Sequence, residues 1–416
     1  MPDTRIADVR VTPIAFYDPP LLNNAGCHEP FALRSIIEVE TEDGTVGLGE
    51  SYGSRDVVEG IEAVADRMRG RDVTDLNGLW SQVGASVQDK DEGYNAGAGR
   101  LALRVAGAIE VALWDAFGKA TGRRLCDLLG GQVRETVPFS AYLFYKFGRH
   151  LGETEDDVWG EVLTPDQLVG EARRMIDLHG FDAIKLKAGV FPPEAEIDGL
   201  RALRAAFPKA PLRIDPNGGW TVETTIRLLA KLDGLIEYLE DPTVGIDGNA
   251  QVQAATKTPL ATNMYVVHPS HLPPNMAQGA FKVILSDHHY WGGLKASRDL
   301  ARICEIWDIG LSMHSNSHLG ISLAAMTHLA AATPNLTYDC DTHYPWQTDE
   351  VIEGGKLQFE GGSLAVPEGP GLGVTLDRAQ LKRLHQNYLD CGITVRDDAS
   401  EMKKHRPDWE FGQPKF

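Results

Sequence analysis

The sequence predicts an α/β fold in which parallel strands and helices alternate around a barrel, with a smaller domain beside it. Short apolar segments that end in polar groups recur along the chain, and five of these ends are Asp215, Glu240, Asn263, Asp287 and His314. Their spacings of 25, 23, 24 and 27 residues suit one strand, one helix and two short loops, since eight such units make a barrel of roughly 250 residues. Because barrel strands end at one mouth, we expect these five side chains to converge there.

The N-terminal part predicts an antiparallel meander followed by helices. Residues 5–50 hold strand-like segments on either side of the turn Thr41–Gly44. Residues 56–130 have a helical pattern that is most regular over Ala106–Lys119. The 416 residues therefore divide into an N-terminal α+β domain at 1–135, the barrel at 136–385 and a C-terminal segment at 386–416 that packs back on the first domain.

From Pro138 onward, short apolar strands alternate with helical stretches such as Thr221–Leu232 and Leu294–Trp307. This order implies parallel strands joined by right-handed crossovers. The expected barrel strands are Ile184–Lys187, Leu212–Asp215, Ile236–Glu240, Leu260–Asn263, Val283–Asp287 and Gly310–His314.

The amino-acid composition limits the kinds of molecule that the protein could bind. The chain has 40 basic and 59 acidic residues, a net charge of −19, and the acidic residues are dispersed. This argues against nucleic acid or an anionic membrane as partner, because both need a basic face. Five cysteines without a CxxC pair indicate free thiols. The first residues lack an apolar signal region and the longest apolar stretch is too short to span a bilayer, so we expect a cytoplasmic protein.

Three oxygen-bearing side chains end successive strands. Asp215, Glu240 and Asn263 offer two carboxylates and an amide oxygen, a set that suits Mg²⁺ and leaves positions for water and substrate oxygens. Any one of them alone is explained as a helix N-cap, but three in register predict a magnesium site. Asp241 and Asp247 are weaker candidates for the middle ligand.

Two lysines and a histidine would flank this site. Lys185 and Lys187 lie two apart on one strand, so their side chains share a face. If they faced solvent instead, Ile184 and Leu186 would fill the barrel. Lysines are rarely buried in a barrel core without a functional reason. Nearby positive charge would lower the pKa of Lys187 and make it a usable base.

Asp287 and His314 end adjacent strands. A carboxylate bonded to one imidazole nitrogen fixes the tautomer and raises the basicity of the other nitrogen, so this pair predicts a second acid–base group. A structural role remains the simpler interpretation for the other histidines of this region, namely His288, His289, His318 and His328.

These motifs together resemble the enolase superfamily, and within it the glucarate dehydratase group (mandelate racemase/glucarate dehydratase-like). The resemblance rests on KxK at 185–187, DPNG at 215–218, EDP at 240–242, ATNM at 261–264 and HSNSH at 314–318. It covers nearly the whole chain and implies a modified TIM barrel, (β/α)7β, with an N-terminal α+β capping domain assisted by the C-terminal segment. It also implies Mg²⁺ and a small dicarboxylic acid sugar as substrate, and we expect a homo-oligomer.

The resemblance carries over substrate-binding residues one position at a time. The loop Leu22–His28 would contribute Asn23 and His28, and the first barrel strand would contribute Tyr142 and Phe144. The last barrel loop would place His343 on a distal hydroxyl or carboxylate. The C-terminal motif VRDD at 395–398 would supply Arg396, whose planar guanidinium can bind both oxygens of a distal carboxylate.

The implied reaction is the dehydration of D-glucarate, and of L-idarate, to 5-dehydro-4-deoxy-D-glucarate. Lys187 and His314 would abstract the α-proton from opposite faces, and His314 would assist loss of the β-hydroxyl. Lys185 would add positive charge, Asp287 would orient His314, and Asn217 would orient the substrate.

Two alternatives stay open. One is a dehydratase or epimerase of another acid sugar in the superfamily. The other is a weakly active glucarate-dehydratase-related protein that assists a true enzyme. Three departures from the group's pattern bear on the substrate: the loop 286–293, a shortened loop after Glu240, and the stretch Asn95–Ala102, which lacks an expected threonine.

Overall fold

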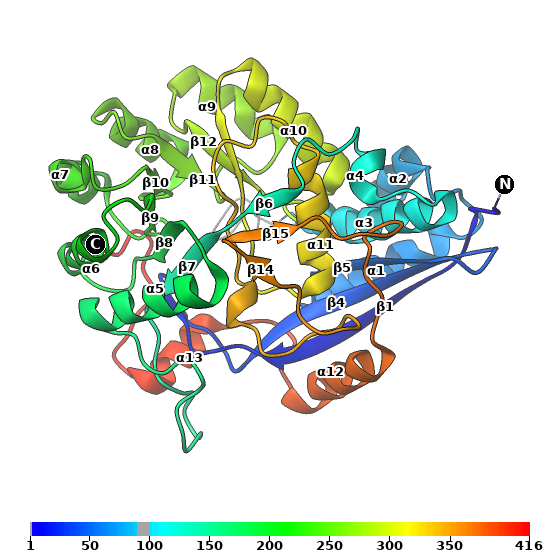
Figure 1. Cartoon of the computed structure of the whole chain (residues 1–416), viewed down its shortest axis with the longest axis horizontal. Helices are drawn as coiled ribbons and strands as arrows, with labels where there is room; N and C mark the ends of the chain where they lie inside the picture. Colours follow the sequence, from blue (N-terminus) through cyan, green and yellow to red (C-terminus); the bar gives the residue numbers. More distant parts are fainter. Residues whose placement is uncertain (1, 90–99) are drawn as a thin grey trace.

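The computed structural model describes residues 2–89 and 100–416 and begins with an antiparallel sheet covered by helices (Figure 1). The sheet has the strand order β1-β4-β5, and its glycines let a helix approach closely: a Cβ on Gly47 would lie 2.1 Å from the Ala112 carbonyl oxygen. Residues 95–99 of the departing stretch Asn95–Ala102 lie outside the described residues. The elements of this part are β1 (Ile6–Tyr17), β2 (Leu22–Asn23), β3 (Gly26–Cys27), β4 (Phe31–Thr41), β5 (Val46–Tyr52), α1 (Arg55–Met68), α2 (Leu76–Ser86), α3 (Leu101–Thr121) and α4 (Leu125–Leu128).

The second part is the barrel, a parallel sheet whose strands follow each other in chain order from β7 to β13. Its strands are β7 (Ser140–Phe144), β8 (Ala183–Lys187), β9 (Leu212–Asp215), β10 (Tyr238–Glu240), β11 (Leu260–Thr262), β12 (Val283–Ser286) and β13 (Gly310–Met313). Its helices are α5 (Pro165–His179), α6 (Pro193–Ala206), α7 (Val222–Leu232), α8 (Gly245–Ala254), α9 (Leu272–Gln278), α10 (Leu294–Ile306) and α11 (Gly320–Ala331).

The segment after α11 closes the barrel. The Cys340 amide donates to the Pro138 carbonyl at 2.9 Å, and the Asp341 amide donates to the Met313 carbonyl at 2.8 Å. This segment therefore lies between β13 and β7 and takes the place of an eighth strand, which confirms the predicted (β/α)7β fold with its N-terminal α+β part.

The remaining elements tie the chain ends to the barrel and to the first sheet. In Figure 1, α12 lies alongside β1, where the Pro13 carbonyl lies 2.7 Å from His385 Nδ1. Because α12 begins at Arg378, the return to the N-terminal sheet starts inside the predicted barrel range, and the three domain boundaries stay a prediction. These elements are β6 (Thr136–Pro138), η1 (Pro269–His271), η2 (Tyr344–Trp346), β14 (Phe359–Glu360), β15 (Ser363–Ala365), α12 (Arg378–Cys391) and α13 (Asp398–His405).

Two buried carboxylates join the N-terminal part to the barrel helices. Glu50 accepts hydrogen bonds from the amides of Leu319 and Ser322 at 2.8 and 2.9 Å, at the start of α11. Glu110, on α3, accepts from the amides of Leu294 and Lys295 at 2.5 and 3.1 Å, at the start of α10. Both satisfy amide groups that a helix leaves unpaired at its N-terminus.

We expect Glu110→Gln to change how stability depends on pH. Burial raises the pKa of Glu110 from 4.5 to about 7, so its contribution to stability is complete below pH 4.5 and is lost as pH rises through 7. The loss amounts to roughly 3 kcal/mol. The free energy of unfolding, measured with urea, should therefore compare more favourably for the variant at pH 8 than at pH 4.5, each time relative to the unmodified protein. The exposed Glu305, at the other end of α10, offers Glu305→Gln as control, and equal pH profiles for both variants would contradict the assignment.

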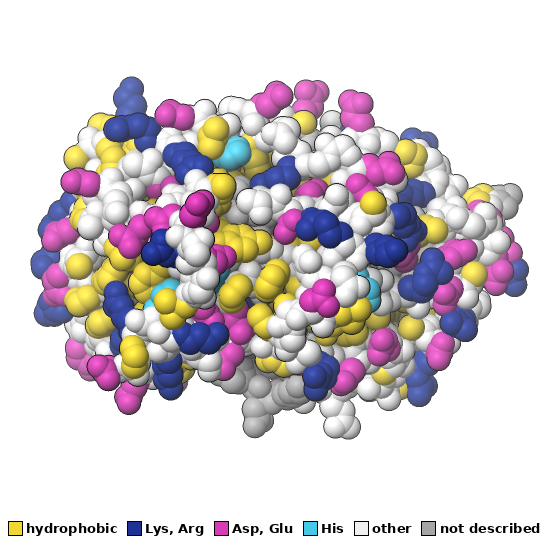
Figure 2. Space-filling model, turned by 90° about the horizontal axis from the view of Figure 1, so that it is seen from below, with side chains coloured by type: hydrophobic (Ala, Val, Ile, Leu, Met, Phe, Trp, Pro, Cys, Tyr) yellow, Lys and Arg dark blue, Asp and Glu magenta, His cyan; other side chains and the backbone are white. Residues whose placement is uncertain are grey.

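The outer surface mixes charges of both signs. Figure 2 shows Lys and Arg side chains interspersed with Asp and Glu on the face seen from below. Within residues 2–89 and 100–416, no helix is both long and apolar enough to cross a membrane.

Candidate active site

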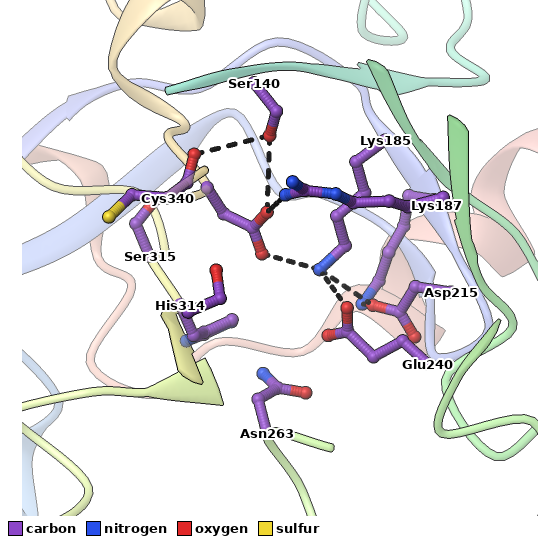
Figure 3. A network of polar contacts seen from close by, with 12 residues as sticks. Ser140, Lys185, Lys187, Asp215, Glu240, Asn263, His314, Ser315 and Cys340 are labelled. Carbon is purple, nitrogen blue, oxygen red and sulfur yellow. Dashed lines mark hydrogen bonds and ion pairs between the residues drawn. The ribbon is translucent and has the colours of Figure 1, made fainter. Parts of the chain in front are cut away.

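The two lysines of β8 point into the barrel, as their spacing predicts, and both are buried. Lys185 Nζ donates to Asp341 Oδ2 at 2.6 Å and forms an ion pair with Glu240 Oε2 at 2.6 Å. Lys187 Nζ donates to Asp215 Oδ2 at 2.6 Å (Figure 3). It also donates to Asn217 Oδ1 at 2.8 Å. Lys185 is thus locked among carboxylates, whereas Lys187 also lines the pocket described below.

The carboxylates around Lys185 favour its charged form. Burial lowers the pKa of Lys185, but the carboxylates of Asp341 and Glu240 outweigh burial and raise it well above its usual value. Burial raises the pKa of Glu240 well above its usual value, and repulsion from Asp215 adds to this against the attraction of Lys185. Three carboxylates thus converge on two lysines, and a bound cation would relieve the repulsion between Asp215 and Glu240.

The oxygen atoms of Asp215, Glu240 and Asn263 fit a hard divalent cation. Within the described chain, the buried atoms Glu240 Oε1 and Asn263 Oδ1 have no hydrogen-bond partner. Buried polar atoms are normally satisfied, and carboxylate and amide oxygens are the ligands that Mg²⁺ prefers. Figure 3 shows the Asp215, Glu240 and Asn263 side chains coming from neighbouring strand ends toward one region.

The two weaker candidates for the middle ligand differ. Asp241 is buried, burial raises its pKa to about 7, and its Oδ2 accepts from the Asn263 amide at 3.0 Å. Asp241 therefore holds the backbone of the proposed metal ligand Asn263 in place. Asp247 is exposed on α8 and accepts from Gln278, so it lies away from the site.

The predicted Asp287–His314 pair forms. His314 Nδ1 lies 2.9 Å from Asp287 Oδ2, which leaves His314 Nε2 for the pocket. Asp287 Oδ1 contacts a second imidazole, His289 Nδ1, at 2.8 Å. Burial raises the pKa of Asp287, but His289 and His314 together hold it well below its usual value. His289, expected to be structural, is therefore part of the network that orients His314.

All six predicted substrate-binding residues line one cavity of about 230 Å³. The cavity also receives Lys187, Asn217, Asn263 and His314. It thus brings together residues from both chain ends and from the barrel. The six are Asn23, His28, Tyr142, Phe144, His343 and Arg396.

Two histidines stand on the aromatic wall of this cavity. His28 and His343 stack with their ring centroids 6.3 Å apart, and Phe144 lies against both rings. His28 Nδ1 lies 2.9 Å from Asp18 Oδ2. Burial holds the pKa of His343 well below its usual value, so this ring is neutral and suits a hydroxyl better than a carboxylate.

Arg396 lines the cavity, but most of its guanidinium is already bound. Its Nε and Nη2 donate to the two oxygens of Asp398 at 2.5 and 2.8 Å. Its Nη1 lies 3.7 Å from Asp18 Oδ2, and Asn23 Nδ2 donates to Asp398 Oδ2 at 3.3 Å. A two-oxygen grip on a distal carboxylate would require Asp398 to be displaced, whereas a single contact through Nη1 would not.

Several lining residues escaped the sequence analysis. Arg34 pairs with the buried Glu50 at 3.1 Å, and its guanidinium lies 4.8 Å from the Tyr52 ring centroid. No spacing rule connects these residues, because they come from the N-terminal sheet and depend on how it docks. Among the lining residues missed are Arg34, Tyr52, Met264, Tyr290, Asn316, Ser317 and Asp398.

Comparison with known proteins agrees with this arrangement. A family model described as "Enolase C-terminal domain-like" matches residues 167–380. The model "Mandelate racemase / muconate lactonizing enzyme, N-terminal domain" matches residues 29–130. The chain belongs to the enolase superfamily. A "Probable glucarate dehydratase" of Streptomyces coelicolor is 47% identical over 98% of this chain and 97% of its own length. This enolase-superfamily chain is therefore a glucarate dehydratase-like enzyme.

Solved superfamily structures share the fold closely. An enolase of Thermobispora bispora, complexed with magnesium and formate, has a TM-score of 0.95 and 52% identity over 99% of this chain and 100% of that one. An enolase of Pseudomonas fluorescens with bound magnesium, potassium and tartrate has a TM-score of 0.96 and 48% identity over 99% of each chain.

Proposed function

We propose that this enzyme dehydrates D-glucarate, and L-idarate, to 5-dehydro-4-deoxy-D-glucarate. The observation that carries the proposal is one cavity lined by both Lys187 and His314. Beside it lie buried oxygen atoms of Glu240 and Asn263 that lack hydrogen-bond partners among residues 2–89 and 100–416. The glucarate dehydratase-like relative supports the substrate class. Tartrate, bound in one superfamily structure, is itself a hydroxylated dicarboxylic acid.

One group of residues would stabilise the negative charge that develops during the reaction. An α-proton beside a carboxylate is a very weak acid, so the enediolate that forms must be stabilised. Asp215, Glu240 and Asn263 would hold Mg²⁺, which supplies Lewis-acid stabilisation of that charge, and relatives carry magnesium. Lys185, kept cationic by its carboxylate neighbours, adds positive charge from inside the barrel.

Proton transfer falls to Lys187 and His314. Lys187 Nζ takes the α-proton from one configuration, and His314 Nε2 takes it from the opposite configuration. The electron pair of the broken C–H bond then expels the β-hydroxyl, which leaves as water with a proton from His314. The resulting enol tautomerises to the keto acid, and Asn217, held by Lys187 at 2.8 Å, orients the substrate.

A second candidate is the dehydration or epimerisation of another acid sugar. It is favoured by Tyr290, which lines the cavity and belongs to the loop 286–293 that departs from the group's pattern. Tyr290 stacks on His314 with ring centroids 5.7 Å apart, so the departure lies directly beside a proposed base. A weakly active protein is disfavoured, because every proposed acid–base group is present and connected.

A screen of all six-carbon aldarates with Mg²⁺, followed by keto-acid formation, tests the function. D-glucarate and L-idarate should give one product. Turnover of a different aldarate alone would favour the second candidate, and no turnover of any would favour the weakly active protein. The cytoplasmic location and the homo-oligomeric state expected from the sequence stay predictions.

We expect Arg396→Ala to separate diacids from monoacids. Loss of a buried charge-assisted contact costs roughly 2–5 kcal/mol, which is on the order of tens to thousands-fold. D-glucarate turnover should fall by that factor, while any weak turnover of gluconate should stay nearly unchanged. Arg383→Ala is the control, because this arginine of α12 pairs with Asp349 and does not line the cavity, so diacid turnover should stay unchanged. Preference of the unmodified enzyme for gluconate over glucarate would overturn the diacid assignment.

A further inference from the structure

A second group of ligand-type side chains lies outside the cavity, where α13 meets the segment that follows β7. His150, Glu401 and His405 offer ligand atoms that all lie within 4.8 Å of one another. Their side chains are only 2%, 2% and 9% exposed. Glu401 and His405 are four residues apart on α13, so they share one helix face. Figure 1 shows α13 beneath the barrel strands, next to the long segment after β7.

The distances do not fit simple hydrogen bonding. Glu401 Oε1 lies 3.7 Å from His150 Nδ1 and 3.9 Å from His405 Nε2. A nitrogen–oxygen hydrogen bond is about 2.7–3.2 Å long. Within the described residues, His150 Nδ1 and His405 Nε2 have no hydrogen-bond partner, although both are buried. Two buried imidazole nitrogens of the described residues thus remain unsatisfied and face the same carboxylate oxygen.

Neighbouring residues orient each of the three side chains so that it can act as a metal ligand. His150 Nε2 lies 2.8 Å from the Asp18 carbonyl oxygen. A carbonyl only accepts, so Nε2 carries the hydrogen and the neutral ring keeps its lone pair on Nδ1. Lys404 Nζ binds Glu401 Oε2 at 2.6 Å, so the other oxygen, Oε1, faces the two imidazoles. Phe147 stacks on the His405 ring at 4.3 Å and limits its rotation.

We infer that His150, Glu401 and His405 form a binding site for a divalent transition-metal ion of the Zn²⁺ class. Bonds of about 2.0–2.1 Å in a tetrahedral site set neighbouring ligand atoms about 3.3–3.5 Å apart. The 3.7 and 3.9 Å separations, and that between the two imidazole nitrogens, which is within 4.8 Å, would contract when the ion binds. Two imidazoles and one carboxylate suit such an ion. The all-oxygen set Asp215, Glu240 and Asn263 suits Mg²⁺ instead, so the two sites select different metals.

The ion would fasten the C-terminal segment over the cavity. Asp398 begins α13 and lines the cavity, and Arg396 lies just before it. On the other side, the residue that accepts from His150 is Asp18, whose carboxylate contacts His28 at 2.9 Å. Metal bound at this site would therefore brace two walls of the cavity without contacting the substrate.

The test is a Co²⁺ and Zn²⁺ titration of the full chain with Mg²⁺ in excess, so that the oxygen site is occupied. The unmodified protein should bind one equivalent and, with Co²⁺, develop the visible absorption of a low-coordinate nitrogen-ligated ion. His150→Gln and His405→Gln should each weaken binding by at least the roughly 10–100-fold that loss of a group behind a metal ligand typically costs. His385→Gln, on neighbouring α12, is the matched control and should bind normally. Bound Zn²⁺ should also slow proteolysis after α12 in the unmodified protein and in the control.

Two results would overturn the site. One is that the unmodified protein binds neither Co²⁺ nor Zn²⁺ when Mg²⁺ is in excess. This test does not depend on any variant. The other is unchanged binding in His150→Gln or His405→Gln. Circular dichroism of each variant without metal shows whether it folds. If His150→Gln does not fold, His405→Gln, at the less buried end of α13, decides the question together with the unmodified protein.

Discussion

Removing divalent metal should abolish turnover, and Mg²⁺ should restore it. At the site, the carboxylates of Asp215, Glu240 and Asp341 outnumber the lysines Lys185 and Lys187. A substrate carboxylate brings negative charge into this buried cluster beside these carboxylates, and the enediolate brings more. Lewis-acid stabilisation is worth several kcal/mol, so the loss should be on the order of a thousand-fold or more.

Protein treated with a chelator and dialysed should form no measurable keto acid until Mg²⁺ is added. Glu240→Gln keeps the size of the ligand but removes its charge, and it should lose activity at any Mg²⁺ concentration or require far more metal. Asp247→Asn is the control, because this acidic residue lies exposed on the following helix and should behave like the unmodified enzyme. Full activity in metal-free buffer would exclude the magnesium site.

The strand ends could be predicted because they depend on local rules. An apolar run that stops at a polar group marks both the strand and the residue at the barrel mouth, so Asp215 and Lys187 end β9 and β8 as expected. Asn263, Asp287 and His314, expected to end their strands, each lie one residue beyond β11, β12 and β13. Strand starts were less certain: the strand expected from Ile236 begins at Tyr238. Ile236 and Glu237 have no distinct pattern that separates the loop from the strand.

Contacts that depend on closure of the fold could not be predicted from spacing. Lys185 binds Asp341, which is 156 residues away and adjacent only because the last segment closes the barrel. His289 looked structural, yet a tight turn brings its ring onto Asp287 two residues earlier. The fork of Arg396 is occupied by Asp398, a pairing that the motif VRDD contains but does not reveal.

The two proposed bases should be separable by proton exchange. Lys187 reaches the cavity from β8, and His314 follows β13, with its Nδ1 bound to Asp287. If they flank one carbon, each serves only one configuration at that carbon. A positioned acid or base contributes roughly 10²–10⁴-fold, so each variant should lose about that factor for its own epimer.

Exchange of the α-proton in D₂O, followed by NMR for D-glucarate and L-idarate, measures this difference. Lys187→Ala should lose exchange from one epimer and keep part of the His314-dependent exchange from the other. His314→Asn should block the opposite epimer and, because His314 also protonates the leaving hydroxyl, stop dehydration of both. Lys187→Arg keeps the positive charge beside Asp215 but cannot take a proton at neutral pH, so it should resemble Lys187→Ala if Lys187 is a base. Recovery of exchange in Lys187→Arg would reduce Lys187 to an electrostatic role, and identical losses for both epimers in Lys187→Ala and His314→Asn would contradict the two-face arrangement.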